Sequence, residues 1–132
     1  MKHKNTLLVL FAIVITGGVV AWTYVNRPIA KVEQARALAI TAESLNNAYS
    51  DNEETANKKY INKALEVSGL VAEVSKNQDG KTVLLLQSDD PMSGVQCTMR
   101  DDVNIDTGKK ITVKGFCTGY TMVVLLSDCI LL

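Results

Sequence analysis

The chain has 132 residues, and its 14 Lys and Arg side chains are balanced by 14 Asp and Glu side chains. Its single histidine, His3, lies near the N-terminus, which excludes dyads and triads with a histidine base from the rest of the chain. Because no ordered nucleophile motif is present either, we expect a protein that is not an enzyme and has neither a cofactor nor a metal.

An uncharged run opens the chain. Residues Thr6 to Val25 contain no charged side chain, and Lys2 and Lys4 stand just before them. At about 1.5 Å rise per residue, such a helix spans roughly the 30 Å of a bilayer's hydrocarbon core. The positive-inside bias keeps the N-terminus in the cytoplasm. Residues 1–27 are therefore predicted to be a signal anchor in the bacterial inner membrane, with everything after Arg27 on the periplasmic side.

This run has three other interpretations. A buried helix of a soluble protein is disfavoured, because nothing polar interrupts the run. Val19 and Ala21 occupy the small-residue positions of a cleavage site, so a cleaved signal peptide would leave a mature chain beginning at Trp22. A lipid anchor is excluded, because the first cysteine of the chain is Cys97. The anchor is favoured by the length of the run and by Trp22 and Tyr24, which fit an interfacial aromatic pair.

A helical segment is expected next, over residues 28–60. The stretch from Ile29 to Ile40 is rich in helix formers and repeats its apolar residues at helical spacing, which predicts a juxtamembrane helix after a kink at Pro28. Thr41 can cap a second helix. Asp51 as an N-cap, with Glu54 three residues on, predicts a third helix ending near residue 60. The apolar face of the second helix is Leu45, Ala48 and Tyr49.

From residue 61 onward the apolar pattern changes to that of strands. Alternation, β-branched residues and turn residues predict five strands. They run over 64–73, 82–88, 95–99, 111–117 and 123–132. Five short antiparallel strands in about 70 residues favour a small closed barrel, because a flat sheet would leave open edges. Gly69 and Gly115 would permit the sharp bends that such a barrel needs.

The order of these pieces resembles the tRNA_anti-like family of bacterial OB-fold lipoproteins, over residues 41–132. The resemblance is carried by Tyr60 and Lys63, Val67–Val71, Asp79–Lys81, Leu86–Asp89, Val95–Cys97, Ile111–Gly115 with Cys117, and Leu126–Leu131. It implies an α+β chain in which an N-terminal transmembrane helix and short helices precede a five-stranded OB-fold β-barrel. It implies no catalytic residues, and the family's name records a likeness to anticodon-binding domains rather than tRNA binding.

One motif resembles a metal site. Asp102, Asn104 and Asp106 have the spacing that opens a calcium loop. Thr107 stands where the loop needs glycine, and Val113 stands where it needs a bidentate glutamate, so we interpret the segment as a polar loop. The acidic pairs Asp89–Asp90 and Asp101–Asp102 are likewise interpreted as solvated loop residues.

The three cysteines all lie in the part predicted to be exported, where disulfides are permitted. Cys117 and Cys129 stand in successive strands and are a candidate disulfide pair, which would leave Cys97 unpaired. Three reduced and buried cysteines are an equally good alternative, because a sequence alone does not fix connectivity.

The predicted ligand surface follows the usual binding face of the OB fold. We expect it to be formed by Gln96 and Thr98 on the third barrel strand, Tyr120 in a turn, and the first hairpin from Asn77 to Lys81. Beyond Lys4, the chain has 12 basic and 14 acidic side chains, a balance that argues against nucleic acid. We therefore expect an envelope protein or a small ligand as partner, with oligonucleotide binding as the alternative.

Overall fold

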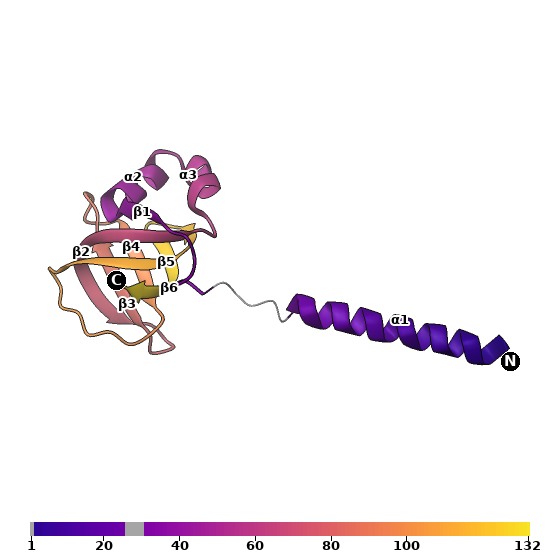
Figure 1. Cartoon of the computed structure of the whole chain (residues 1–132). Coiled ribbons are helices and arrows are strands. Elements are labelled where there is room, and N and C mark those ends of the chain that lie inside the picture. Colours follow the sequence, from indigo (N-terminus) through magenta and orange to yellow (C-terminus); the bar gives the residue numbers. More distant parts are fainter. Residues whose placement is uncertain (1, 26–30) are drawn as a thin grey trace. The chain divides into compact units, whose positions relative to one another are not determined.

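The structure is a computed structural model that describes residues 2–25 and 31–132. The chain divides into two compact units, Met1–Ala30 and Lys31–Leu132. In the first unit, helix α1 runs from Lys2 to Val25, and its part from His3 onward is long and apolar enough to cross a bilayer (Figure 1). A signal sequence would meet the same criterion. The predicted kink at Pro28 lies outside the described residues.

The second unit contains two short helices and six strands. The helices are α2 (Ala42–Asp51) and α3 (Glu53–Tyr60). The strands are β1 (Leu38–Thr41), β2 (Ala64–Lys76), β3 (Thr82–Gln87), β4 (Gly94–Met99), β5 (Lys110–Tyr120) and β6 (Val124–Leu131). The five strands predicted from the sequence are therefore confirmed as β2 to β6, with boundaries that differ by a few residues.

Strands β2 to β6 close into a barrel, as expected for an OB fold. The strand order is β1-β2-β3-β4-β6-β5, and a further pairing between β2 and β5 closes the circle. Strand β2 is long enough to pair with two barrel strands in succession. Residues Ala64 to Leu70 pair with β5, and residues Val71 to Lys76 pair with β3. Gly115 lies at a register shift between β5 and β6, consistent with its predicted role at a bend.

The first strand corrects the prediction of a helix from Ile29 to Ile40. Residues 31–36 form a turn, in which the amides of Gln34 and Ala35 both donate to the Lys31 carbonyl. Leu38–Thr41 then pairs in parallel register with Leu65–Ser68 of β2. Helix propensity is a weak local preference, and here the hydrogen bonds offered by a strand that lies far along the chain outweigh it.

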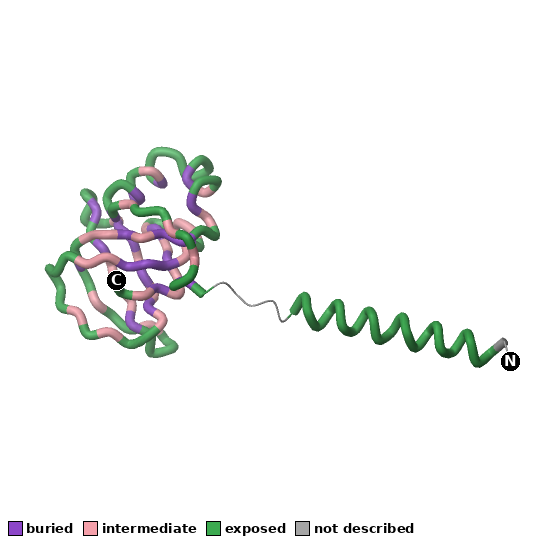
Figure 2. Tube along the Cα trace, in the orientation of Figure 1, coloured by how far each residue is buried: buried purple, intermediate pink, exposed green. Residues whose placement is uncertain are grey.

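Helices α2 and α3 bury their apolar faces in the same core as the barrel strands. Thr41 caps α2 by accepting a hydrogen bond from the Ser44 amide, as predicted. The cap of α3 is Asn52, which accepts from the Thr55 amide, whereas Asp51 belongs to α2. The core cluster includes Leu45, Tyr49, Ala56 and Tyr60 from the two helices. Figure 2 shows the buried positions concentrated in the barrel strands and on the helix faces turned toward them.

Candidate functional site

The centre of the predicted ligand surface is strand β4. Its residues alternate: Val95, Cys97 and Met99 are buried in the core, while Gln96 and Thr98 between them are half-buried. Because successive side chains of a strand point to opposite faces, Gln96 and Thr98 project from the outside of the barrel. Their predicted placement on one outer face agrees with this alternation.

The neighbouring strands complete this outer face with aliphatic side chains. Gln96 lies between Leu85 of β3 and Leu125 of β6, and Thr98 lies opposite Val83. These three aliphatic residues are half-buried and are not members of the core cluster. We call the five residues the β4 face: Val83, Leu85, Gln96, Thr98 and Leu125.

The sequence signal for these aliphatic residues is the presence of apolar residues on both sides of β3 and β6. Helices that cover the outside of the barrel would be one explanation for such runs. In the structure, however, the buried apolar residues of α2 and α3 belong to the core cluster. The β4 face is thus a partly apolar surface, with two polar side chains at its centre.

The first hairpin lies at one end of the β4 face. Asn77 accepts hydrogen bonds at Oδ1 from the amides of Asp79 (3.0 Å) and Lys81 (2.9 Å), so its side chain is used to hold the turn. Gly80 adopts a φ of 76°, which explains why this corner of the turn is glycine. Lys81 is exposed and remains available to a ligand.

Tyr120 lies toward the other end of the strands and differs from its prediction in two ways. It is the last residue of β5, paired with Val124, rather than part of a turn. Its ring stacks on the buried ring of Tyr49, with centroids 5.1 Å apart and an interplanar angle of 22°. One ring face is therefore occupied by the protein, and the half-buried Tyr120 is mainly a contact between β5 and α2.

A charged cluster stands beyond the β4 face, where β4 ends. Arg100 donates from Nε to Oδ1 of Asp128 (2.8 Å) and from Nη2 to Oδ2 (2.7 Å), and its third nitrogen bonds Glu33. The hydrogen bonds from Arg100 lower the pKa of Asp128 below its usual value. Asp128 has a φ of 53°, so this bidentate contact also holds a strained backbone position.

The segment with calcium-loop spacing is a structural loop. Asp102 forms an ion pair with Lys76 and accepts a hydrogen bond from the Thr82 hydroxyl at 2.6 Å. These two contacts lower the pKa of Asp102. Val103 and Ile105 pack against the core, which leaves Asn104 between them at the surface. Within residues 2–25 and 31–132, no three His, Cys, Asp or Glu side chains are grouped so that they could hold a metal.

The three cysteines are free thiols buried in the core. Cys117 contacts the Tyr49 hydroxyl at 3.3 Å. The neighbouring Cys129 thiol and burial raise the pKa of Cys97, and burial raises the pKa of Cys117. Protonated buried thiols are poor nucleophiles. The Cys117–Cys129 disulfide stays a prediction.

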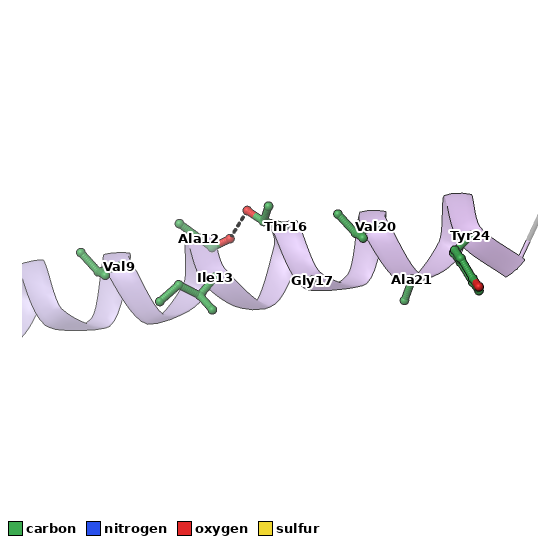
Figure 3. Close-up of a pocket in the computed structure, with 8 residues that line it drawn as sticks. All are labelled: Val9, Ala12, Ile13, Thr16, Gly17, Val20, Ala21 and Tyr24. Carbon is green, nitrogen blue, oxygen red and sulfur yellow. Dashed lines mark hydrogen bonds between the residues drawn. The ribbon is translucent and has the colours of Figure 1, made fainter.

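A shallow hollow runs along one face of α1 (Figure 3). It is lined by Val9, Ala12, Ile13, Thr16, Gly17, Val20, Ala21 and Tyr24. The Thr16 hydroxyl donates to the Ala12 carbonyl at 2.7 Å and so satisfies its polar group within the helix. Since a single helix supplies every lining residue, the hollow is an apolar helix surface rather than an enclosed site.

Comparisons with known proteins agree with this fold. The tRNA_anti-like family matches residues 1–130. A similar solved structure is that of a protein from Klebsiella pneumoniae subsp. pneumoniae MGH 78578, described as a putative nucleic acid-binding lipoprotein, with a TM-score of 0.58. The likeness covers 73% of this chain and 92% of that chain at 10% sequence identity, so it supports the fold alone. No curated protein matches the chain.

Proposed function

The chain belongs to the tRNA_anti-like family, and on this premise we propose that it is a membrane-anchored OB-fold binding or adaptor module of the bacterial envelope, without catalytic activity. The observation that carries the proposal is the β4 face, a partly apolar outer surface on the strands that OB folds use for ligands. Its partner is an envelope protein or a small ligand bound over Gln96 and Thr98.

The chemistry of the β4 face favours such a partner. Aliphatic side chains flank Gln96 on both sides, which suits apolar contact around a central amide that can both donate and accept hydrogen bonds. Core-like apolar area with a few polar groups is the usual composition of a binding patch. Lys81 and the hairpin extend the surface at one end.

Site-specific photocrosslinking tests this proposal in cells. A photoreactive phenylalanine analogue at Gln96 should give a discrete crosslinked product from membranes. The matched control places the same analogue at Asn47, an exposed amide residue of α2. Equal crosslinking from both positions, or none from Gln96, would contradict a partner on the β4 face.

Nucleic-acid binding is the second candidate, favoured by the description of the Klebsiella protein. Base stacking on single strands needs exposed aromatic side chains, and the β4 face contains none. Fluorescence anisotropy with a labelled oligothymidine decides between the two. We expect weak binding at low salt. Sub-micromolar binding that falls by about 100-fold or more on raising salt from about 50 to 200 mM would establish the alternative.

The membrane anchor is proposed on the length and composition of α1. An alkaline phosphatase fused after Leu132 should be active, because the enzyme folds only outside the cytoplasm. N-terminal sequencing of the membrane-bound protein should begin at Met1. A soluble periplasmic protein that begins at Trp22 would instead show that the segment is a cleaved signal peptide.

A further inference from the structure

A second cavity, lined by both polar and apolar residues, lies on the barrel wall where α2 begins. It has a volume of about 390 Å³ and is lined by Thr41, Ala42, Glu43, Ser68, Gly69, Leu70, Gln87 and Lys110. This volume falls within the roughly 300–1,000 Å³ of small-molecule pockets. None of these residues belongs to the β4 face, so the cavity is independent of the function proposed above.

A gap in strand pairing creates the cavity. Strand β1 ends its pairing with β2 at Thr41 and Ser68, and β3 begins its pairing with β2 only at Val71. Gly69 and Leu70 lie between these two points, so in the described strand register this stretch of β2 lacks a neighbour on that side. A Cβ at Gly69 would stand 3.0 Å from the Cβ of Ala42. Glycine therefore allows α2 to approach and form one wall.

Polar side chains around the cavity are left without protein partners. No hydrogen bond or ion pair within the described residues involves the side chain of Ser68, Gln87 or Lys110. Lys110 is exposed and comes from β5, opposite Leu70 in the strand register. Residues with an amide, a hydroxyl and an ammonium group thus line one pocket, and none of these three groups is bonded to the described part of the protein.

A negatively charged residue also lines the cavity. Glu43 lies in the first turn of α2, and a hydrogen bond with the neighbouring carboxyl of Asp89 raises its pKa. Two carboxyl groups held this close repel each other when both are ionised, and a cationic group beside them relieves that repulsion. Glu43 and Lys110 line the same cavity but form no ion pair with each other in the structure as described.

A ligand that carries one positive and one negative charge can pair with Glu43 and with Lys110 at the same time. We infer that the cavity binds a zwitterion of amino-acid or dipeptide size, with its ammonium group beside Glu43 and its carboxylate beside Lys110. Gln87 and Ser68 are then placed to bond the amide or hydroxyl groups of the ligand. Leu70, which is 44% exposed at the rim, offers an apolar contact for a ligand side chain.

The test is calorimetric titration of the full chain in detergent micelles with L-alanyl-L-alanine. N-acetyl-alanyl-alanine lacks the cation, and alanyl-alanine amide lacks the carboxylate. We expect each to bind at least about tenfold more weakly than the zwitterion, because each loses a charge-assisted contact. An equal affinity for all three compounds would overturn the inference, as would absence of binding up to about 10 mM, beyond the millimolar range of weak complexes.

Variants locate the binding. Lys110→Gln should weaken binding of alanyl-alanine by at least about tenfold. The matched control is Lys109→Gln, because Lys109 is also exposed and is adjacent but does not line the cavity. Glu43→Gln should remove the preference for alanyl-alanine over its N-acetyl form. Folding of each variant is checked by its thermal unfolding transition, and binding that survives both cavity variants in folded protein would refute this location.

Discussion

Gly115 is a position at which the packing of the barrel leaves no room for a side chain. A Cβ added there would lie 2.5 Å from Sγ of Cys129, closer than van der Waals contact allows, and 3.1 Å from the Ser127 carbonyl oxygen. Cys129 is fully buried in the core, so its thiol has little room to move. Gly115→Ala is therefore expected to overpack the core, which typically costs about 1–3 kcal/mol.

The unfolded chain offsets part of this cost. Alanine has fewer conformations than glycine in the unfolded chain, which stabilises the folded state by about 0.4–1 kcal/mol where the backbone tolerates the substitution. The net loss is then about 1–2 kcal/mol, which at about 4–8 °C per kcal/mol lowers the Tm by roughly 4–16 °C. Cys129→Ala alone loses one buried atom, worth about 1 kcal/mol on the scale of a methylene group.

A double-mutant cycle separates the steric clash from other effects. In Gly115→Ala combined with Cys129→Ala, the Sγ atom that clashes is gone, and only the approach to the Ser127 carbonyl remains. The loss in free energy of unfolding in the double variant should be smaller than the sum of the two single losses by about 1–2 kcal/mol, within the usual range for residues in contact. Thermal unfolding of the full chain in micelles measures all four proteins. Additivity within about 0.5 kcal/mol would refute this account of Gly115.

Three further predictions concern contacts that hold the elements together. The Arg100 contact lowers the folded-state pKa of Asp128. Asp128 therefore stabilises the fold above its unfolded pKa of about 3.9, and this stabilisation is lost as the pH falls through the folded-state pKa. The difference in Tm between the wild-type protein and Asp128→Asn should be constant near neutral pH and shrink below about pH 4. Tyr49→Ala should cost about 3–5 kcal/mol because it removes a fully buried ring, whereas Tyr49→Phe keeps the ring and should cost much less, as chemical denaturation would show. Thr41→Ala removes the side-chain acceptor for the Ser44 amide and should cost about 1 kcal/mol, with Thr41→Ser as the tolerated control in the same measurement.

The parts of the fold predicted from the sequence are those that local patterns determine. The alternation of Val95 to Met99 gives the inward and outward faces of β4, and hence the outward placement of Gln96 and Thr98. The cap at Thr41 depends on residues within one helical turn, and it too was predicted correctly. Both features involve neighbours only a few residues apart in the chain.

The parts that sequence reasoning missed depend on partners far along the chain. The stacking of Tyr120 on Tyr49 is one example, because no local pattern connects a strand residue to a ring on a separate helix. Arg100 joins Asp128 to Glu33 across three distant segments, and no motif marks this cluster. Such contacts form only when the barrel closes, so their residues look like ordinary surface positions in the sequence.

Strand β1, most of which was predicted to be helical, also determines whether the cavity beside α2 exists. If these residues continued a helix, Thr41 would not pair with Ser68, and the start of α2 would not be fixed beside Gly69. Because β1 is only four residues long, β2 lacks a neighbour on that side at Gly69 and Leu70 in the described strand register, before its pairing with β3 begins. The same pairing that overrides helix propensity therefore builds one wall of the cavity, while the β4 face depends only on strands that the sequence pattern had already predicted.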